Sequence, residues 1–120
     1  MARAISHADG KAALARWKAD PVECPRSVTA TAVRYTLAEL AALYPGHSVE
    51  VRVPPFGAVQ ILEGTHHRRG TPPAVVEMKA PTWLDLALGN LAWKQAQRTG
   101  VVTASGQRTD LGHLLPLPVL

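Results

Sequence analysis

The histidines are the side chains in this sequence best suited to metal binding or proton transfer, but their spacing does not gather them. His66 and His67 are adjacent, so in an extended chain they point to opposite sides. A metal site needs ligands that converge from one face. His47 and His113 have no histidine or carboxylate at i+2 or i+4. We therefore expect no metal ion and no cofactor.

The sequence also shows no nucleophile or acid–base pair in a recognisable setting. No serine lies in a GxSxG elbow, and there is no glycine-rich phosphate loop. Cys24 is the only cysteine and has no base at a recognisable spacing. Glu77, Asp85 and Asp110 fall in different expected elements, too far apart for paired carboxylates. We expect a protein that is not an enzyme and that has no disulfide.

The clearest structural pattern runs from Arg69 to Gly106. Apolar residues recur there at i, i+1, i+4, i+5 and i+8, on one face of a helix, at Trp83, Leu84, Ala87, Leu88 and Leu91. Prolines and glycines mark the boundaries between the elements of this segment. One β-branched run lies before its helical part and another lies after it. The pattern predicts, in order, a strand at 74–78, a helix opened by Pro81 and ended near Gly89, helical turns at 91–98 closed by Gly100, and a strand at 101–104.

The preceding and following segments complete the expected elements. Valines at 49, 51 and 53 alternate with polar residues, which predicts a strand with one wet face. In the segment before them, β-branched residues oppose a helix, but an apolar stripe from Val33 to Tyr44 favours one. We predict a helix at 8–19 capped by Asp9, a helix from Ser27 or Thr29 to Tyr44, a hairpin of strands 47–53 and 56–63, a short strand at 66–68 and a final helical turn at 109–115.

These elements predict an α+β fold of four to five mostly antiparallel strands, with helices covering one face. A chain of 120 residues can bury a hydrophobic core without disulfides or metal ions to stabilise it. We expect a single domain over 1–120, with an N-terminal helix and linker at 1–26 and the core at 27–120.

Several motifs occur in a characteristic order: VxxTLxEL at Val33 to Leu40, RGTPP at Arg69 to Pro73, TWLxLALGxLxW at Thr82 to Trp93, and GxVxASGxRxDLxxLLPL at Gly100 to Leu117. With this order and spacing the chain resembles the small stand-alone bacterial members of the sterol-carrier-protein family. Lys79–Ala80 replaces the family's usual Asp-Pro, and Ala92 stands where Ser or Thr is common. Both changes remove N-caps worth about 1 kcal/mol each.

The resemblance implies a sheet covered by helices on one side, with an apolar tunnel between the layers. On the residues alone, the Trp83 to Trp93 stripe is more typical of solid core. Through the resemblance, eight residues become candidate walls of a lipid site: Leu84, Leu88, Leu91 and Trp93, with Val51, Val59, Ile61 and Val101 opposite. The apolar tail residues Leu114, Leu115, Leu117, Val119 and Leu120 either fold back over the cavity mouth or contact a membrane or partner.

We therefore predict a non-catalytic module that carries a sterol, fatty acid or acyl chain. The alternative is an accessory or protein-interaction domain with a closed cavity, as in the mycothiol-dependent isomerases, which leaves a protein partner or homodimer open. Net charge is +4, and the basic cluster at 66–69 lacks interleaved aromatics. We expect transient contact with anionic membranes rather than nucleic acid. Without a signal sequence or membrane-length apolar run, we expect a cytoplasmic location.

Overall fold

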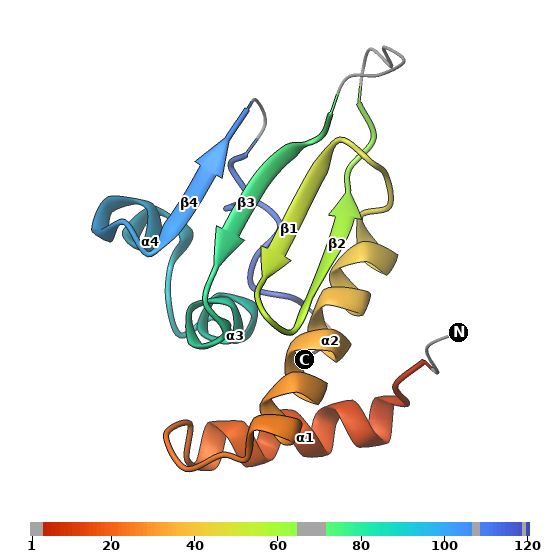
Figure 1. The fold of residues 1–120 in the computed structure, drawn as a ribbon, viewed down its shortest axis with the longest axis vertical. Helices are drawn as coiled ribbons and strands as arrows, with labels where there is room; N and C mark the ends of the chain where they lie inside the picture. Colours follow the sequence, from red (N-terminus) through yellow and green to blue (C-terminus); the bar gives the residue numbers. More distant parts are fainter. Residues whose placement is uncertain (1–3, 65–71, 107–108, 119) are drawn as a thin grey trace.

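The computed structural model describes residues 4–64, 72–106, 109–118 and 120. Two N-terminal helices precede three strands, and a pair of short helices precedes the last strand (Figure 1). The elements are α1 (His7–Ala19), α2 (Arg26–Leu43), β1 (Val49–Val53), β2 (Gly57–Ile61), β3 (Ala74–Met78), α3 (Ala80–Leu88), α4 (Trp93–Thr99) and β4 (Val102–Ser105).

The four strands form one mixed sheet in the order β2-β1-β3-β4. The β1–β2 pair is an antiparallel hairpin in which Val51 lies opposite Val59. β3 then runs parallel to β1 and antiparallel to β4. The predicted α+β class with a mostly antiparallel sheet is confirmed. The predicted strand at 66–68 lies outside the described residues.

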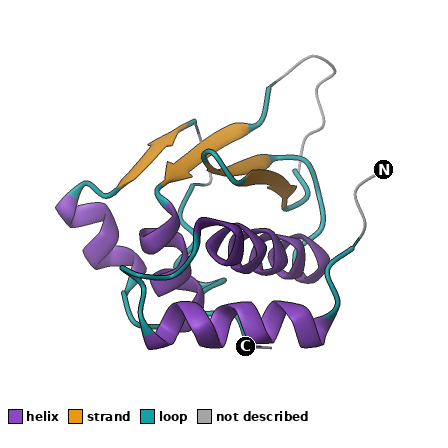
Figure 2. Cartoon of the chain, turned by 60° about the horizontal axis from the view of Figure 1, so that its bottom comes forward, coloured by secondary structure: helices purple, strands orange, loops and turns teal. Residues whose placement is uncertain are grey.

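The four helices of the described residues lie on one side of the sheet. Figure 2 shows α2 directly against the sheet and α1 on the far side of α2. In β1, the side chains of Val49, Val51 and Val53 are buried toward the helices, while Arg52 is exposed on the opposite face. The period-two alternation of the sequence therefore sets which face of the sheet is covered.

The helix α2 forms despite its β-branched residues because its apolar stripe is buried. Val33, Leu37 and Leu40 are at most 1% exposed. The Thr36 hydroxyl, which is fully buried, donates to the carbonyl of Ala32 one turn earlier at 2.8 Å. Its polar group is thus satisfied inside the helix, and tertiary burial outweighs the local preference for strand.

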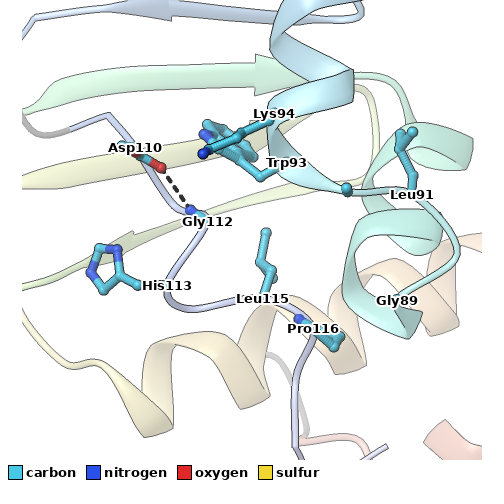
Figure 3. A pocket seen from close by; sticks show the side chains of 10 residues that line it. Gly89, Leu91, Trp93, Lys94, Asp110, Gly112, His113, Leu115 and Pro116 are labelled. Carbon is cyan, nitrogen blue, oxygen red and sulfur yellow. Dashed lines mark hydrogen bonds between the residues drawn. The ribbon is translucent and has the colours of Figure 1, made fainter.

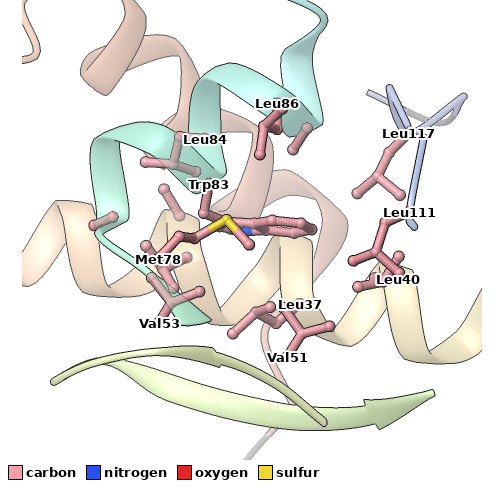
Figure 4. Packing of buried hydrophobic residues seen from close by; sticks show 14 of the residues in the cluster. Leu37, Leu40, Val51, Val53, Met78, Trp83, Leu84, Leu86, Leu111 and Leu117 are labelled. Atoms are coloured by element: carbon pink, nitrogen blue, oxygen red, sulfur yellow. The ribbon is translucent and has the colours of Figure 1, made fainter. Parts of the chain in front are cut away.

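Trp83 of α3 fills the space between the helices and the sheet. Its side chain is fully buried, and its indole Nε1 donates to the Thr36 Oγ1 at 2.8 Å. Figure 4 shows the ring among apolar side chains that include Leu37, Val51 and Met78. The centre of the molecule, where the two layers face each other, is therefore packed with protein side chains.

The predicted side-chain caps of the first two helices are wrong. Ser6, not Asp9, caps α1, since its Oγ accepts from the Asp9 backbone N–H at 3.1 Å. α2 begins at Arg26 after Pro25 and has no side-chain cap from Ser27 or Thr29. The predicted end of α3 is confirmed, because Gly89 takes the left-handed conformation there.

The C-terminal segment differs from its predicted helical turn. Residues 109–118 form turns rather than a helix. Leu111, Leu114 and Leu117 are buried in the core, and the Leu117 N–H donates to the Ala87 carbonyl of α3 at 2.9 Å. The tail thus folds back against the helices, although Leu120 is 37% exposed. Whether the tail covers a cavity mouth stays a prediction. Val119 lies outside the described residues.

The strand predicted at 101–104 begins one residue later, because Val101 still belongs to the end of α4. Gly100 takes φ 75° at the C-cap, and the Val101 N–H donates to the Ala96 carbonyl at 3.2 Å. This pattern closes the helix. The side chain of Val101 is 45% exposed, which corrects its predicted inward position.

Replacing Thr36 by Val should destabilise the protein by about 1–3 kcal/mol, because it leaves the buried Trp83 N–H without an acceptor. In the Thr36→Val background, Trp83→Phe should then cost about 1 kcal/mol less than in the wild type. Urea unfolding of the four proteins measures both effects. Thr31→Val is the matched control, because its hydroxyl bonds the Ser27 carbonyl in an exposed setting. Additive costs would show that the two side chains do not interact.

Replacing Gly10 by Ala should weaken the docking of α1. A Cβ at this position would overlap the ring of Tyr35, and such overpacking costs about 1–3 kcal/mol. The gain in helix propensity offsets only about 1 kcal/mol. Thermal unfolding should show a lower midpoint than for the exposed control Lys11→Ala. An unchanged or raised midpoint would contradict this packing.

Candidate functional site

The eight predicted wall residues occupy different environments. Leu84, Val51 and Ile61 are fully buried in the same core cluster as Trp83. Leu88 and Val59 are half-buried and pack against that core. These five side chains therefore contribute to packing. Whether they also contact a ligand stays a prediction.

Leu91 and Trp93 line a pocket of about 530 Å³ between the helix pair α3–α4 and the folded-back tail (Figure 3). We call it the tail pocket. Its lining comes from the α3–α4 connection, the start of α4 and the tail: Gly89, Leu91, Ala92, Trp93, Lys94, Asp110, Gly112, His113, Leu115 and Pro116. Such a volume falls within the usual range for small-molecule sites.

Local chain geometry explains why the tail pocket forms. The left-handed Gly89 ends α3, and the Asn90 N–H donates to the Asp85 carbonyl at 2.8 Å, so the chain turns sharply. The hydrogen bond from Leu117 to Ala87 holds the far end of the tail on α3. A Cβ at Gly89 would lie 3.3 Å from Cγ of Pro116, so a glycine allows the tail to approach closely.

The two ends of the tail pocket differ in polarity. Leu91, Leu115 and Pro116 give one end an apolar surface. Figure 3 shows Lys94 and Asp110 together beside Trp93, away from Leu91 and Pro116. The Asp110 Oδ1 accepts from the Gly112 backbone N–H at 2.9 Å, which orders a tight turn. An elongated molecule with one polar end would match this arrangement.

Trp93 differs from Trp83 in its hydrogen bonding. Its side chain is 4% exposed, and its indole Nε1 is buried with no hydrogen-bond partner. A buried donor without an acceptor costs about 1–3 kcal/mol. A Cβ at Gly112 would lie 3.3 Å from Cδ1 of Trp93, so the nitrogen-bearing edge of the ring lies beside the Asp110–Gly112 turn.

Val101 lines a second pocket, also about 530 Å³, at the far end of α4. Its walls come from the ends of β3 and α4, the start of α3 and the β1–β2 turn: Pro54, Glu77, Met78, Lys79, Thr82, Gly100, Val101 and Thr103. A larger share of its lining is polar than in the tail pocket, which makes it less suited to an apolar molecule.

One cluster of titratable groups joins α1 to α2. His7 Nδ1 lies 2.9 Å from the Tyr35 hydroxyl and 3.7 Å from Glu39 Oε1. Burial, and to a smaller extent the neighbouring Glu39, raises the pKa of Tyr35 above its usual value. Each contact runs between the two helices, so the cluster is placed to hold α1 on α2.

Metal ligands do not converge in the described part of the chain: no group of three His, Cys, Asp or Glu side chains there could hold an ion. His66 and His67 lie outside that part. None of the described helices is both long enough and apolar enough to span a bilayer.

The family described as "Bacterial SCP ortholog" matches residues 25–117. The chain belongs to this family. The match begins just before α2 and ends within the tail, so it includes the sheet, the helix pair and both ends of the tail pocket. α1 precedes the matched range. No curated protein matches the chain.

Sequence reasoning missed the polar end of the tail pocket. Lys94, Asp110 and His113 were not among the predicted site residues, because no pattern in the sequence brings the tail beside α4. A local signal did exist, since Asp110 followed by Gly112 is typical of a turn. The turn places the tail beside Trp93 instead of extending a helix.

Replacing Trp93 by Phe should destabilise the protein about 1 kcal/mol less than replacing Trp83 by Phe. Both changes remove part of a buried indole, but only Trp83 loses a hydrogen bond, whereas Trp93 loses an unpaired donor. Urea unfolding of the two variants tests this difference. If Trp93→Phe is the more costly change, the N–H of Trp93 has an acceptor in solution.

Proposed function

We propose that this protein is a non-catalytic carrier that binds an apolar small molecule in the tail pocket. The observation that supports this most directly is a pocket of about 530 Å³ with an apolar end, in a chain that belongs to the bacterial SCP family. The bound molecule would be a fatty acid, a sterol or an acyl chain.

The packing of the core favours the tail pocket over the centre of the molecule. Trp83 occupies the space where the helices face the sheet, and Leu84, Val51 and Ile61 of the same core cluster are fully buried. A ligand there would have to displace well-packed side chains, which is costly. The tail pocket needs no such rearrangement, because its walls already leave room.

Burial of the ligand's own surface would supply the binding energy. Transfer of apolar surface from water contributes about 25 cal/mol per Å², from which immobilisation is subtracted. Leu91, Leu115 and Pro116 provide the surface against which a hydrocarbon chain can lie. This kind of binding tolerates different chains, as expected for a carrier.

The chemistry of the protein supports an inference about its environment. Cys24 is a free thiol, which suits a reducing compartment, and we infer that the carrier acts in the cytoplasm. Its excess of basic residues supports brief contact with anionic membranes, where an apolar molecule would be collected or released.

A displacement assay with a fluorescent fatty acid tests the proposal. Ala92 lines the tail pocket and is exposed, so Ala92→Trp should fill the pocket and lower affinity at least tenfold. Val101→Trp is the matched control, because Val101 is likewise exposed but lines the second pocket. It should leave affinity unchanged. Saturable binding that Val101→Trp abolishes and Ala92→Trp does not would contradict the proposed site.

A further inference from the structure

The indole N–H of Trp93 is an unused hydrogen-bond donor in the wall of a ligand-sized pocket. The side chain is 4% exposed, Nε1 has no partner, and the residue lines the tail pocket. Buried donors in folded proteins are usually paired. Trp83 in the same protein follows that rule through Thr36, so the unpaired state of Trp93 needs a separate explanation.

We propose that Trp93 determines specificity by donating its N–H to an uncharged oxygen, such as a hydroxyl or carbonyl, on the apolar ligand. This inference rests on the proposed function, because it assigns the head group of the molecule carried in the tail pocket. The indole nitrogen can only donate, so it selects a ligand atom that accepts.

The geometry places the edge of the ring that carries this donor beside the Asp110–Gly112 turn, which lines the polar end of the pocket. Cδ1, which is bonded to Nε1, lies close to Gly112, and Gly112 is held by Asp110. The turn lies along the edge of the ring and leaves Nε1 buried. Because Nε1 is buried, a ligand oxygen can contact it only through a shift of the Asp110–Gly112 turn. Because Gly112 has no side chain, little of the turn lies over this edge of the ring.

The charges around the donor favour an uncharged head group. Lys94 and Asp110 both line the pocket beside Trp93 and carry opposite charges. Lys94 would attract a carboxylate head group, but Asp110 would repel it, so the two charges oppose each other. A hydroxyl, in contrast, can accept from Trp93 and donate to a carboxylate oxygen of Asp110 at the same time.

Competition with decanol and decanethiol under reducing conditions tests the inference. The two molecules differ only in the head atom, and sulfur is a much weaker acceptor than oxygen. In Trp93→Phe the ratio of decanol to decanethiol affinity should fall about five- to tenfold relative to the wild type. The ratio cancels the effect of the smaller ring, which acts on both molecules. Trp83→Phe should leave the ratio unchanged.

Three outcomes would overturn the inference. The first is an unchanged ratio in Trp93→Phe while both molecules still displace the fluorescent fatty acid. It would show that the N–H does not bind the head group, and the proposed carrier function would be unaffected. Tighter binding of decanoate than decanol, lost in Lys94→Met, would show an anionic head group instead. If decanol, decanethiol and decanoate all fail to displace the fluorescent fatty acid, the carrier function itself is rejected.

Discussion

The structure depends on the hydrogen bond between two buried side chains, the indole of Trp83 and the hydroxyl of Thr36. The N–H of this central indole has an acceptor, and that acceptor is itself bonded to the Ala32 carbonyl within α2. This chain of bonds ties α3 to α2 above the sheet. It also fills the gap between the layers, so space for a ligand remains at the margin, where the tail meets α3 and α4.

The elements governed by local patterns could be predicted from the sequence. A few neighbouring residues determine each of these elements. Examples are the alternating valines of β1, the β-branched run of β3 and the glycine that ends α3. The family resemblance added the arrangement of these elements. Cap positions were less predictable, because Ser6 and Asp9 are both good capping residues and only the folded chain shows which one is used.

What the sequence could not show depends on contacts between distant segments. Trp83 and Thr36 are 47 positions apart, and nothing local marks them as partners. Val101 looked like the start of a strand because it is β-branched, but its N–H is used to close α4. The tail pocket required the tail to fold back onto Ala87, which brought Leu115 and Asp110 beside residues of α3 and α4 that sequence reasoning had placed against the sheet.

Two of the three buried tryptophans thus have opposite roles: Trp83 is central and its N–H is paired, whereas Trp93 lies beside a pocket and its N–H is unpaired. Its three tryptophans, Trp17, Trp83 and Trp93, should give three separate indole N–H signals in an NMR spectrum. Titration with decanol measures the central claim most directly. The account predicts that the Trp93 signal shifts to saturation while the Trp83 signal stays in place. A shift of Trp83 with Trp93 unchanged would place the ligand between the layers and contradict the account.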